Sequence, residues 1–121
     1  MPDETTAFIN SNNWLEITLG KFISEKDYIH LITLVYDLAL ELEDKDYPVM
    51  LLVDCSGQED MEEMAEKHAV KGTRDLHFNK IASFGLKPKF IPLLSTIVTE
   101  TGNAEIKDFP TRAEAVDWLQ S

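Results

Sequence analysis

The chain has 121 residues, of which 44% are hydrophobic, so it is long enough for one domain and apolar enough to bury a core. Eleven basic residues stand against 22 acidic residues, and the formal charge of −11 disfavours a general binder of DNA or RNA phosphates. A single cysteine excludes a disulfide framework and any metal site built from several thiolates, and it fits a reducing compartment. We therefore expect one domain over residues 1–121, in the cytoplasm.

Neither the first ten residues nor the longest apolar stretch predicts a targeting or membrane segment. Residues 1–10 contain no basic region followed by an apolar one. The apolar stretch Ile29–Leu42 is interrupted by His30, Thr33 and Asp37. We expect no transmembrane segment, which leaves open a peripheral contact with a membrane surface.

The chain begins with a predicted β-hairpin. Thr5–Ile9 and Trp14–Leu19 both alternate apolar and polar residues, as strands with one buried face do. Asn10–Asn13 between them consists of turn-forming residues.

A long amphipathic helix follows the hairpin. Ser24 and Asp27 have the spacing of a capping box, which marks the start of a helix. The helix is expected to end near Asp44. Its apolar face comprises Tyr28, Leu31, Ile32, Val35, Leu38, Ala39 and Leu42.

The middle of the chain predicts a buried strand and a second helix. Pro48 prevents the first helix from continuing, and Val49–Val53 is a short unbroken apolar run, typical of a strand buried on both faces. Ser56 and Glu59 repeat the capping-box spacing, which predicts a helix over Gln58–Leu76. The apolar face of this helix would hold Met61, Met64, Ala65, His68, Gly72 and Leu76.

A third core strand and a third helix come next. Ile81–Phe84 is apolar enough for a central strand. Pro88 or Pro92 would lie in the first turn of the following helix, because proline is tolerated there. That helix would end near Thr101, with Gly102–Asn103 as its stop signal.

The last strand and helix complete an alternating order. Glu105–Phe109 is the predicted strand, and Thr111 with Glu114 forms a third capping box before the terminal helix. The resulting order is ββαβαβαβα. It predicts an α/β fold whose four or five strands form a mixed, mostly parallel sheet, with the first strand antiparallel at an edge.

Basic residues are concentrated in residues 67–89, which carry six basic groups and one acidic group. Lys67, Lys71 and Arg74 fall on one side of the second helix, whose first residues are acidic. This region could be a docking patch for an acidic partner or an anionic lipid head group. The interpretation we favour is that the charges complement the helix dipole.

No residue pattern predicts catalysis, a cofactor or a metal ion. Cys55 precedes a predicted helix, where a thiol pKa can be lowered, but His30, His68 and His77 have no spacing that would place a base beside it. We expect a half-buried free cysteine. The histidines also lack a paired ligand at helical spacing, and no glycine-rich phosphate loop or nucleophile elbow occurs in the chain.

Four short strings occur in the order and spacing of a known family. They are Leu19–Ile23, Val53–Gly57, Lys80–Gly85, and Ile106–Phe109 followed by Glu114–Leu119. With these strings the chain resembles the SpoIIAA-like proteins, single-domain relatives of the STAS domain found in anti-sigma-factor antagonists and sulfate-transporter tails. The resemblance covers nearly the whole chain and implies a sheet of repeated βα units with the helices mainly on one side.

The resemblance also implies a role in binding rather than in catalysis. STAS domains of sigma-factor control are switched by phosphorylation of a serine at the start of the second helix, but here Asp60–Met64 contains no hydroxyl. The phosphorylation switch is therefore not expected. Other SpoIIAA-like proteins look like carriers of apolar molecules with a cavity between sheet and helices. Residues that would line such a cavity here are Met61, Met64, Phe90, Ile91, Leu93 and Leu94.

Two functions follow from these observations. The first is a non-enzymatic regulatory or interaction module with a protein partner, and the second is a binder of a small apolar or lipid-like ligand. A homodimer stays open. The candidate surface for ligand or partner follows the strand Val49–Val53, because functional loops gather at the carboxyl ends of parallel strands. It consists of Asp54, Ser56, Gly57, Met61 and Met64.

Overall fold

The structure is a computed structural model that describes residues 5–101 and 105–121. The strands are β1 (Thr6–Ile9), β2 (Leu15–Thr18), β3 (Phe22–Ile23), β4 (Met50–Asp54), β5 (Asp60–Met61), β6 (Lys80–Phe84) and β7 (Glu105–Phe109). The helices are α1 (Glu25–Asp44), α2 (Glu63–Asp75), α3 (Ile91–Thr101) and α4 (Arg112–Gln120), with a short 3-10 helix, η1 (Pro88–Phe90), before α3. The predicted stop signal Gly102–Asn103 lies outside the described residues.

Five strands form the main sheet in the order β1-β2-β4-β6-β7. Only β1 is antiparallel to its neighbour, and the other pairs are parallel. This confirms the predicted α/β fold with a mixed, mostly parallel sheet and an antiparallel edge strand. The register places Leu15, Leu51, Ile81 and Ile106 side by side across four strands.

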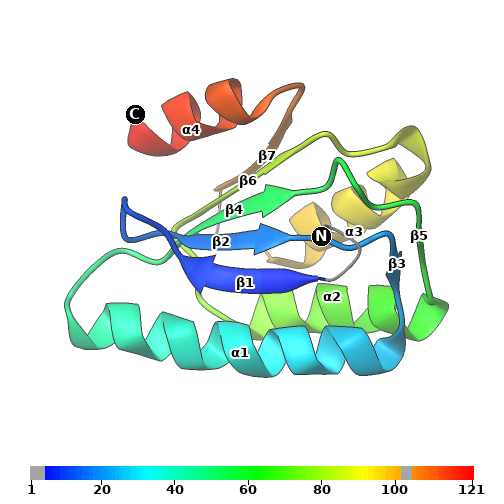
Figure 1. Ribbon diagram of the computed structural model, residues 1–121, viewed down its shortest axis with the longest axis horizontal. Coiled ribbons are helices and arrows are strands. Elements are labelled where there is room, and N and C mark those ends of the chain that lie inside the picture. The colour runs from blue at the N-terminus through cyan, green and yellow to red at the C-terminus, as the bar shows by residue number, and fades with distance from the viewer. Residues whose placement is uncertain (1–4, 102–104) are drawn as a thin grey trace.

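Helices cover both faces of the sheet, but unequally. In Figure 1, α4 lies on one side of the strands and α1 and α2 lie on the other. The core beneath α1 and α2 is mainly aliphatic and includes the fully buried Leu15 together with Leu51. The core beneath α4 contains Trp14 and Leu52. Alternate residues of each strand serve the two cores, as the two-residue period of a strand requires.

The long helix α1 begins as its sequence predicts. The Ser24 hydroxyl accepts a hydrogen bond from the Asp27 N–H at 3.1 Å, and the Asp27 carboxylate accepts one from the Ser24 N–H at 3.1 Å. These two bonds complete the capping box. The pKa of the Asp27 carboxyl is lowered because the Ser24 N–H, and to a smaller extent the Ser24 side chain, favours its charged form. The inner face of α1 buries Leu31, Val35 and Leu42 against the sheet.

The second helix starts later than its sequence predicts. The spacing of Ser56 and Glu59 indicated a helix from Gln58, whereas α2 begins at Glu63 with Glu62 as its N-cap residue. The Ser56 hydroxyl does not cap this helix, because it donates to Asp54 Oδ1 at 2.5 Å. The predicted capping box at this position is therefore wrong.

The residues before α2 form a second, two-stranded sheet instead. β5 pairs in parallel with β3, and Phe22 and Ile23 lie opposite Asp60 and Met61. The pairing buries Ile23 and Met61 in one small apolar cluster. Met61 is thus a strand residue, and the expectation that Met61 and Met64 lie one turn apart on a helix is wrong.

Candidate functional site: an apolar pocket under α3

A pocket of about 130 Å³ lies between the main sheet, α2 and α3. Its walls combine strand residues, residues from the inner sides of α1 and α2, and residues of the segment from Leu86 through α3. We call it the α3 pocket. The described residues that line it are Ile17, Leu19, Tyr28, Leu31, Leu51, Val53, Cys55, Gln58, Met61, Ala69, Thr73, Ile81, Ser83, Leu86, Phe90, Leu93, Leu94, Ile97 and Ile106.

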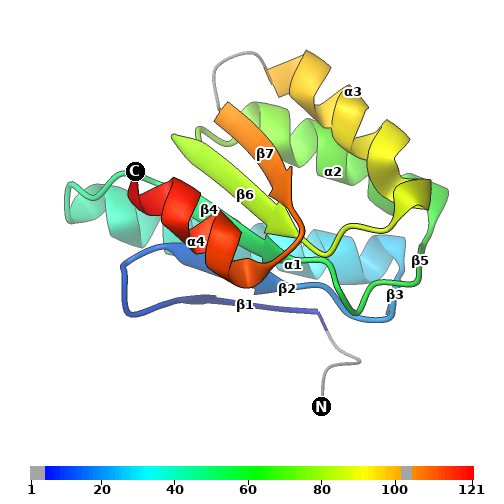
Figure 2. The same cartoon turned by 90° about the horizontal axis from the view of Figure 1, so that it is seen from above.

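Helix α3 leaves this space open because it packs mainly on α2. Figure 2 shows α3 next to α2, on the β7 side of the molecule. None of the residues of α3 is fully buried, whereas Phe90 immediately before it is 4% exposed. Phe90 joins the Ile23 and Met61 cluster and so anchors the start of α3, while the rest of the helix forms an outer wall of the pocket.

The cavity expected from the sequence is present, with four of its six predicted lining residues. Met61, Phe90, Leu93 and Leu94 line the α3 pocket. The other two predicted lining residues, Met64 and Ile91, are 45% and 55% exposed and do not line it.

The five residues of the candidate surface predicted after β4 do not all lie together in the structure. Asp54, Ser56 and Gly57 form a tight loop in which Asp54 Oδ1 accepts from both the N–H and the hydroxyl of Ser56. Met61 contributes to the pocket wall, and Met64 lies on the exposed side of α2. The structure therefore brings the loop and Met61 to one region and leaves Met64 outside it.

Cys55 lies in the pocket wall and is only 4% exposed. Burial raises the pKa of its thiol to about 12, and the nearby carboxylates of Asp108 and Asp54 act in the same direction. A thiol with so high a pKa is almost entirely protonated near neutral pH and is a poor nucleophile. The expected half-buried cysteine is in fact buried, and its environment is the opposite of one that activates a thiol.

His68, which the sequence places on the apolar face of the second helix, contacts a residue of α1. Its Nε2 lies 3.0 Å from Glu25 Oε2, and the imidazole is about one-third exposed. The contact joins the start of α1 to α2. Within the described ranges, no group of three or more His, Cys, Asp or Glu side chains is arranged to hold a metal ion.

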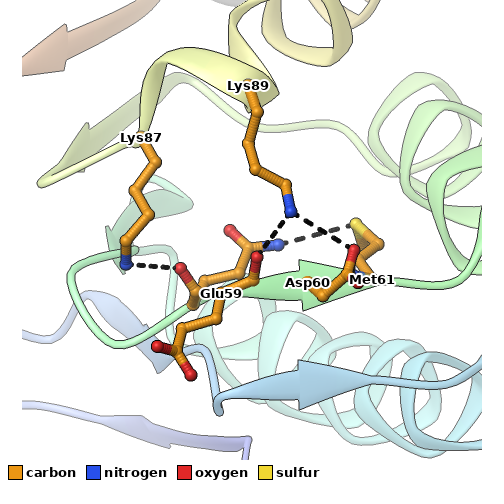
Figure 3. Close-up of polar contacts among 6 residues, drawn as sticks. Glu59, Asp60, Met61, Lys87 and Lys89 are labelled. Carbon is orange, nitrogen blue, oxygen red and sulfur yellow. Dashed lines mark hydrogen bonds and ion pairs between the residues drawn. The ribbon is translucent and has the colours of Figure 1, made fainter.

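Two lysines tie the segment before α3 to the loop after β4 (Figure 3). Lys87 Nζ donates to the carbonyl oxygens of Ser56 and Gln58, at 3.2 and 2.6 Å. Lys89 Nζ donates to the Glu59 carbonyl at 2.7 Å and lies 3.4 Å from Asp60 Oδ1. The carboxylate of Asp60 has a lowered pKa because it accepts from the Met61 N–H and faces Lys89.

These contacts explain part of the basic region that the sequence leaves ambiguous. Lys87 and Lys89 donate hydrogen bonds to carbonyl oxygens of the loop after β4. The ammonium of Lys80 likewise donates to the Trp118 and Ser121 carbonyls. On α2, Lys67 pairs with Glu63 at 3.9 Å. Lys67, Lys80, Lys87 and Lys89 thus make contacts within the molecule, while the interpretation that charges on α2 complement its dipole stays a prediction.

We predict that removing the Lys87 contacts and removing the Lys89 contacts will lower the free energy of unfolding by different amounts. Lys87→Met should lower the free energy of unfolding by about 1 to 2 kcal/mol, because it removes a partly buried hydrogen bond from a charged donor to the Gln58 carbonyl. Lys89→Met should cost less than about 1 kcal/mol, since its contacts are exposed. Urea unfolding measures both, and hydrogen exchange should show faster exchange in residues 56–61 for Lys87→Met. Equal losses in the two variants would contradict this assignment.

Comparison with known proteins agrees with this architecture. The model of the family described as SpoIIAA-like matches residues 14–120. The chain belongs to the SpoIIAA-like family. No curated protein was found to match it.

A crystal structure of an uncharacterized protein with a SpoIIAA-like fold, from Shewanella loihica PV-4, is similar to this SpoIIAA-like chain with a TM-score of 0.67. The two sequences are 19% identical, and the alignment covers 95% of this chain and 91% of that chain. At this identity the likeness concerns the fold alone. Among the helices of the described ranges, none is both long enough and apolar enough to cross a membrane.

Sequence reasoning missed several residues of the site. Tyr28 was assigned only to the apolar face of the first helix, and Gln58 only to the start of the second, although both line the α3 pocket. A buried Gln58, 2% exposed, had no sequence signal because its place depends on the β3 and β5 pairing. Lys87 and Lys89 carried only the signal of local positive charge.

Proposed function

We propose that this SpoIIAA-like protein binds a small apolar ligand in the α3 pocket and acts as a binding module rather than as an enzyme. The observation that carries the proposal is the pocket itself, which is lined mainly by aliphatic and aromatic side chains and closed on one side by a helix without a buried residue. Concave apolar space of this kind is typical of small-molecule sites.

The position of α3 supports the same function. A helix that contributed only to a closed core would bury its apolar residues against the sheet. Here Leu93, Leu94 and Ile97 are only partly buried, although they face the pocket. A ligand in the pocket would cover these side chains and add the apolar contacts that they lack.

A pair of variants on α3 tests the proposal. Ile97→Trp should fill the pocket and weaken binding of a pocket ligand at least tenfold, because Ile97 lies in its wall. Val98→Trp is the matched control, since Val98 is the next residue and is 47% exposed. Native mass spectrometry of gently purified wild-type protein should show a retained small molecule that is depleted in Ile97→Trp and kept in Val98→Trp. Equal retention in all three proteins would contradict binding in this pocket.

A second candidate function is docking of a protein partner on the outer side of α1. A groove of about 300 Å³ runs between α1 and α2 and is lined by Ile29, Tyr36 and His68 among others. Ile29 and Tyr36 are 45% and 51% exposed and line the same groove, and exposed apolar residues that gather on one surface are typical of interaction sites. In the cells from which the gene comes, the two variants should distinguish the two functions. Tyr36→Glu alters the groove between α1 and α2, and Ile97→Trp alters the α3 pocket. Loss of the cellular phenotype with Tyr36→Glu alone would favour docking.

A further inference from the structure

Two polar side chains in the wall of the α3 pocket have hydrogen-bonding capacity that the described part of the chain does not use. The side-chain amide of Gln58 makes one contact, from Nε2 to the sulfur of Met61 at 3.6 Å, and sulfur is a weak acceptor. The Tyr28 hydroxyl has no hydrogen-bond partner among the described residues, and burial raises the pKa of this phenol well above its usual range.

Neither group is sealed away from the pocket. In the described residues, no buried side-chain nitrogen or oxygen is both inaccessible and without a partner. The Tyr28 hydroxyl and the Gln58 amide oxygen therefore face space that a small molecule can reach. Gln58 is only 2% exposed and lines the α3 pocket, so the space beside its amide oxygen is the pocket. Tyr28 lines the α3 pocket and also a smaller pocket of about 30 Å³ between the sheet, α1 and α2.

Both polar residues lie near Met61 in the pocket wall. Gln58 contacts Met61 directly, and Tyr28 packs both against the cluster that contains Met61 and against the core that contains Ile81. Most of the remaining wall is hydrocarbon, including Ile97 from α3 and Ile106 from β7. Gln58 and Tyr28 are therefore the residues of the wall that offer free donors and acceptors.

The other polar side chains of the wall are already engaged. The Thr73 hydroxyl donates to the Ala69 carbonyl at 2.8 Å, and the Ser83 hydroxyl donates to Asp108 Oδ1 at 2.7 Å. No side chain that lines the pocket, among those described, is charged. A charged ligand would lose its hydration there without gaining an ion-pair partner.

The volume of the pocket limits the size of the ligand. An engineered apolar cavity of about 150 Å³ binds benzene, so the 130 Å³ found here is suited to a molecule of about one six-membered ring. Longer chains would have to extend past α3 into solvent.

We infer that the α3 pocket selects an uncharged ligand, about the size of a single ring, that carries one hydroxyl group. Its hydroxyl lies between Gln58 and Tyr28, and its apolar body points toward Ile97 and Ile106. Gln58 accepts the hydroxyl hydrogen, and Tyr28 donates to the hydroxyl oxygen. This inference rests on the proposed function and adds the chemistry of the ligand to it.

Four probes of similar size test the inference by titration of isotopically labelled protein at pH 7. They are phenol, benzene, benzoate and benzylammonium. We expect phenol to bind about 3- to 10-fold more tightly than benzene, the gain of one or two hydrogen bonds, and both ions to bind at least 10-fold more weakly than phenol. The amide shifts should cluster on the residues that line the pocket.

Variants show whether Gln58 and Tyr28 carry the preference. Gln58→Met and Tyr28→Phe should each bring the phenol and benzene affinities within about twofold of each other while benzene binding is kept. Tyr36→Phe is the matched control, because Tyr36 is 51% exposed and outside the pocket, and it should bind as the wild type does. Benzene binding by each variant also verifies that the pocket has folded.

The outcomes separate this inference from the proposed function. If benzene binds as tightly as phenol, or either ion binds best, the selection for a neutral hydroxyl is wrong while binding in the pocket stands. If both variants keep the phenol preference, Gln58 and Tyr28 do not carry it. If none of the four probes shifts the pocket residues of the wild type, both the inference and the proposed function are wrong.

Discussion

A Gly85→Ala variant should lose about 2 to 4 kcal/mol of unfolding free energy, from left-handed backbone strain and overpacking together. Gly85 has a φ of +72°, in the region that residues with a Cβ rarely adopt. A Cβ built there would lie 2.9 Å from Ser56 Cβ and 3.0 Å from Ser56 Cα. The contact involves backbone of the loop after β4, so a side-chain rotation cannot relieve it.

The effect of this substitution should extend to the pocket. Gly85 follows β6, and its N–H donates to the Phe109 carbonyl at 3.2 Å, so it fixes the turn that approaches the Ser56 loop. That loop leads directly into Gln58 and Met61 in the pocket wall. We expect the displaced loop to weaken ligand binding as well as stability.

Gly57→Ala is the control for Gly85→Ala. A Cβ at Gly57 would meet only the Leu19 carbonyl oxygen, at an ordinary 3.5 Å, and the backbone there is not left-handed. Its unfolding free energy should stay within about 1 kcal/mol of wild type. Urea unfolding of the two variants makes the comparison, and a Gly85→Ala protein as stable as Gly57→Ala would show that this turn tolerates a side chain.

The fold was accessible from the sequence because its main elements have strong periodic patterns. The capping box at Ser24 and the apolar face of α1 predict that helix almost to the residue. The apolar run at Val49–Val53 predicts β4, since a strand buried on both faces typically reads as a short unbroken apolar run. The strands β3 and β5 have two residues each, too few to show a period, and their pairing joins distant parts of the chain.

The misplaced start of α2 shows how a local motif can be overridden. Ser56 and Glu59 have the spacing of a capping box, but Asp54, two residues earlier, takes the Ser56 hydroxyl. Burial of Gln58 and Met61 then favours an extended segment over a helical turn. The first contact is a local competitor of the cap, and the second depends on the tertiary pairing of β5 with β3, so the capping-box spacing alone could not decide between them.

The location of the candidate site could be predicted from the sequence, but the polar side chains in its wall could not. A cavity between sheet and helices follows from the family resemblance, and apolar residues near Phe90 were natural lining residues. Which residues of α2 and α3 turn inward depends on where each helix begins, and this is why Met64 and Ile91 were wrong. The roles of Gln58 and Tyr28 appear only when the pocket around them is known.

Cys55 should react about a thousandfold more slowly with iodoacetamide at pH 7.5 than the same thiol in urea-unfolded protein. The pKa of the buried thiol is raised to about 12, roughly three units above an ordinary cysteine, and alkylation needs the thiolate. Equal rates in native and unfolded protein would contradict this. Cys55→Ala replaces one small buried side chain by another and should keep the fold.

The same raised pKa predicts how stability depends on pH. The folded state disfavours the thiolate, so the unfolded state loses this proton first as pH rises. The stabilising effect is complete below about pH 8.5 and is lost as pH rises toward 12, at up to about 1.4 kcal/mol per pH unit. Cys55→Ala lacks this ionisation while it keeps the buried Tyr28 hydroxyl. Between pH 9 and about pH 11 the unfolding free energy of wild type should therefore fall more steeply than that of Cys55→Ala, and parallel curves would show that the folded thiol ionises normally.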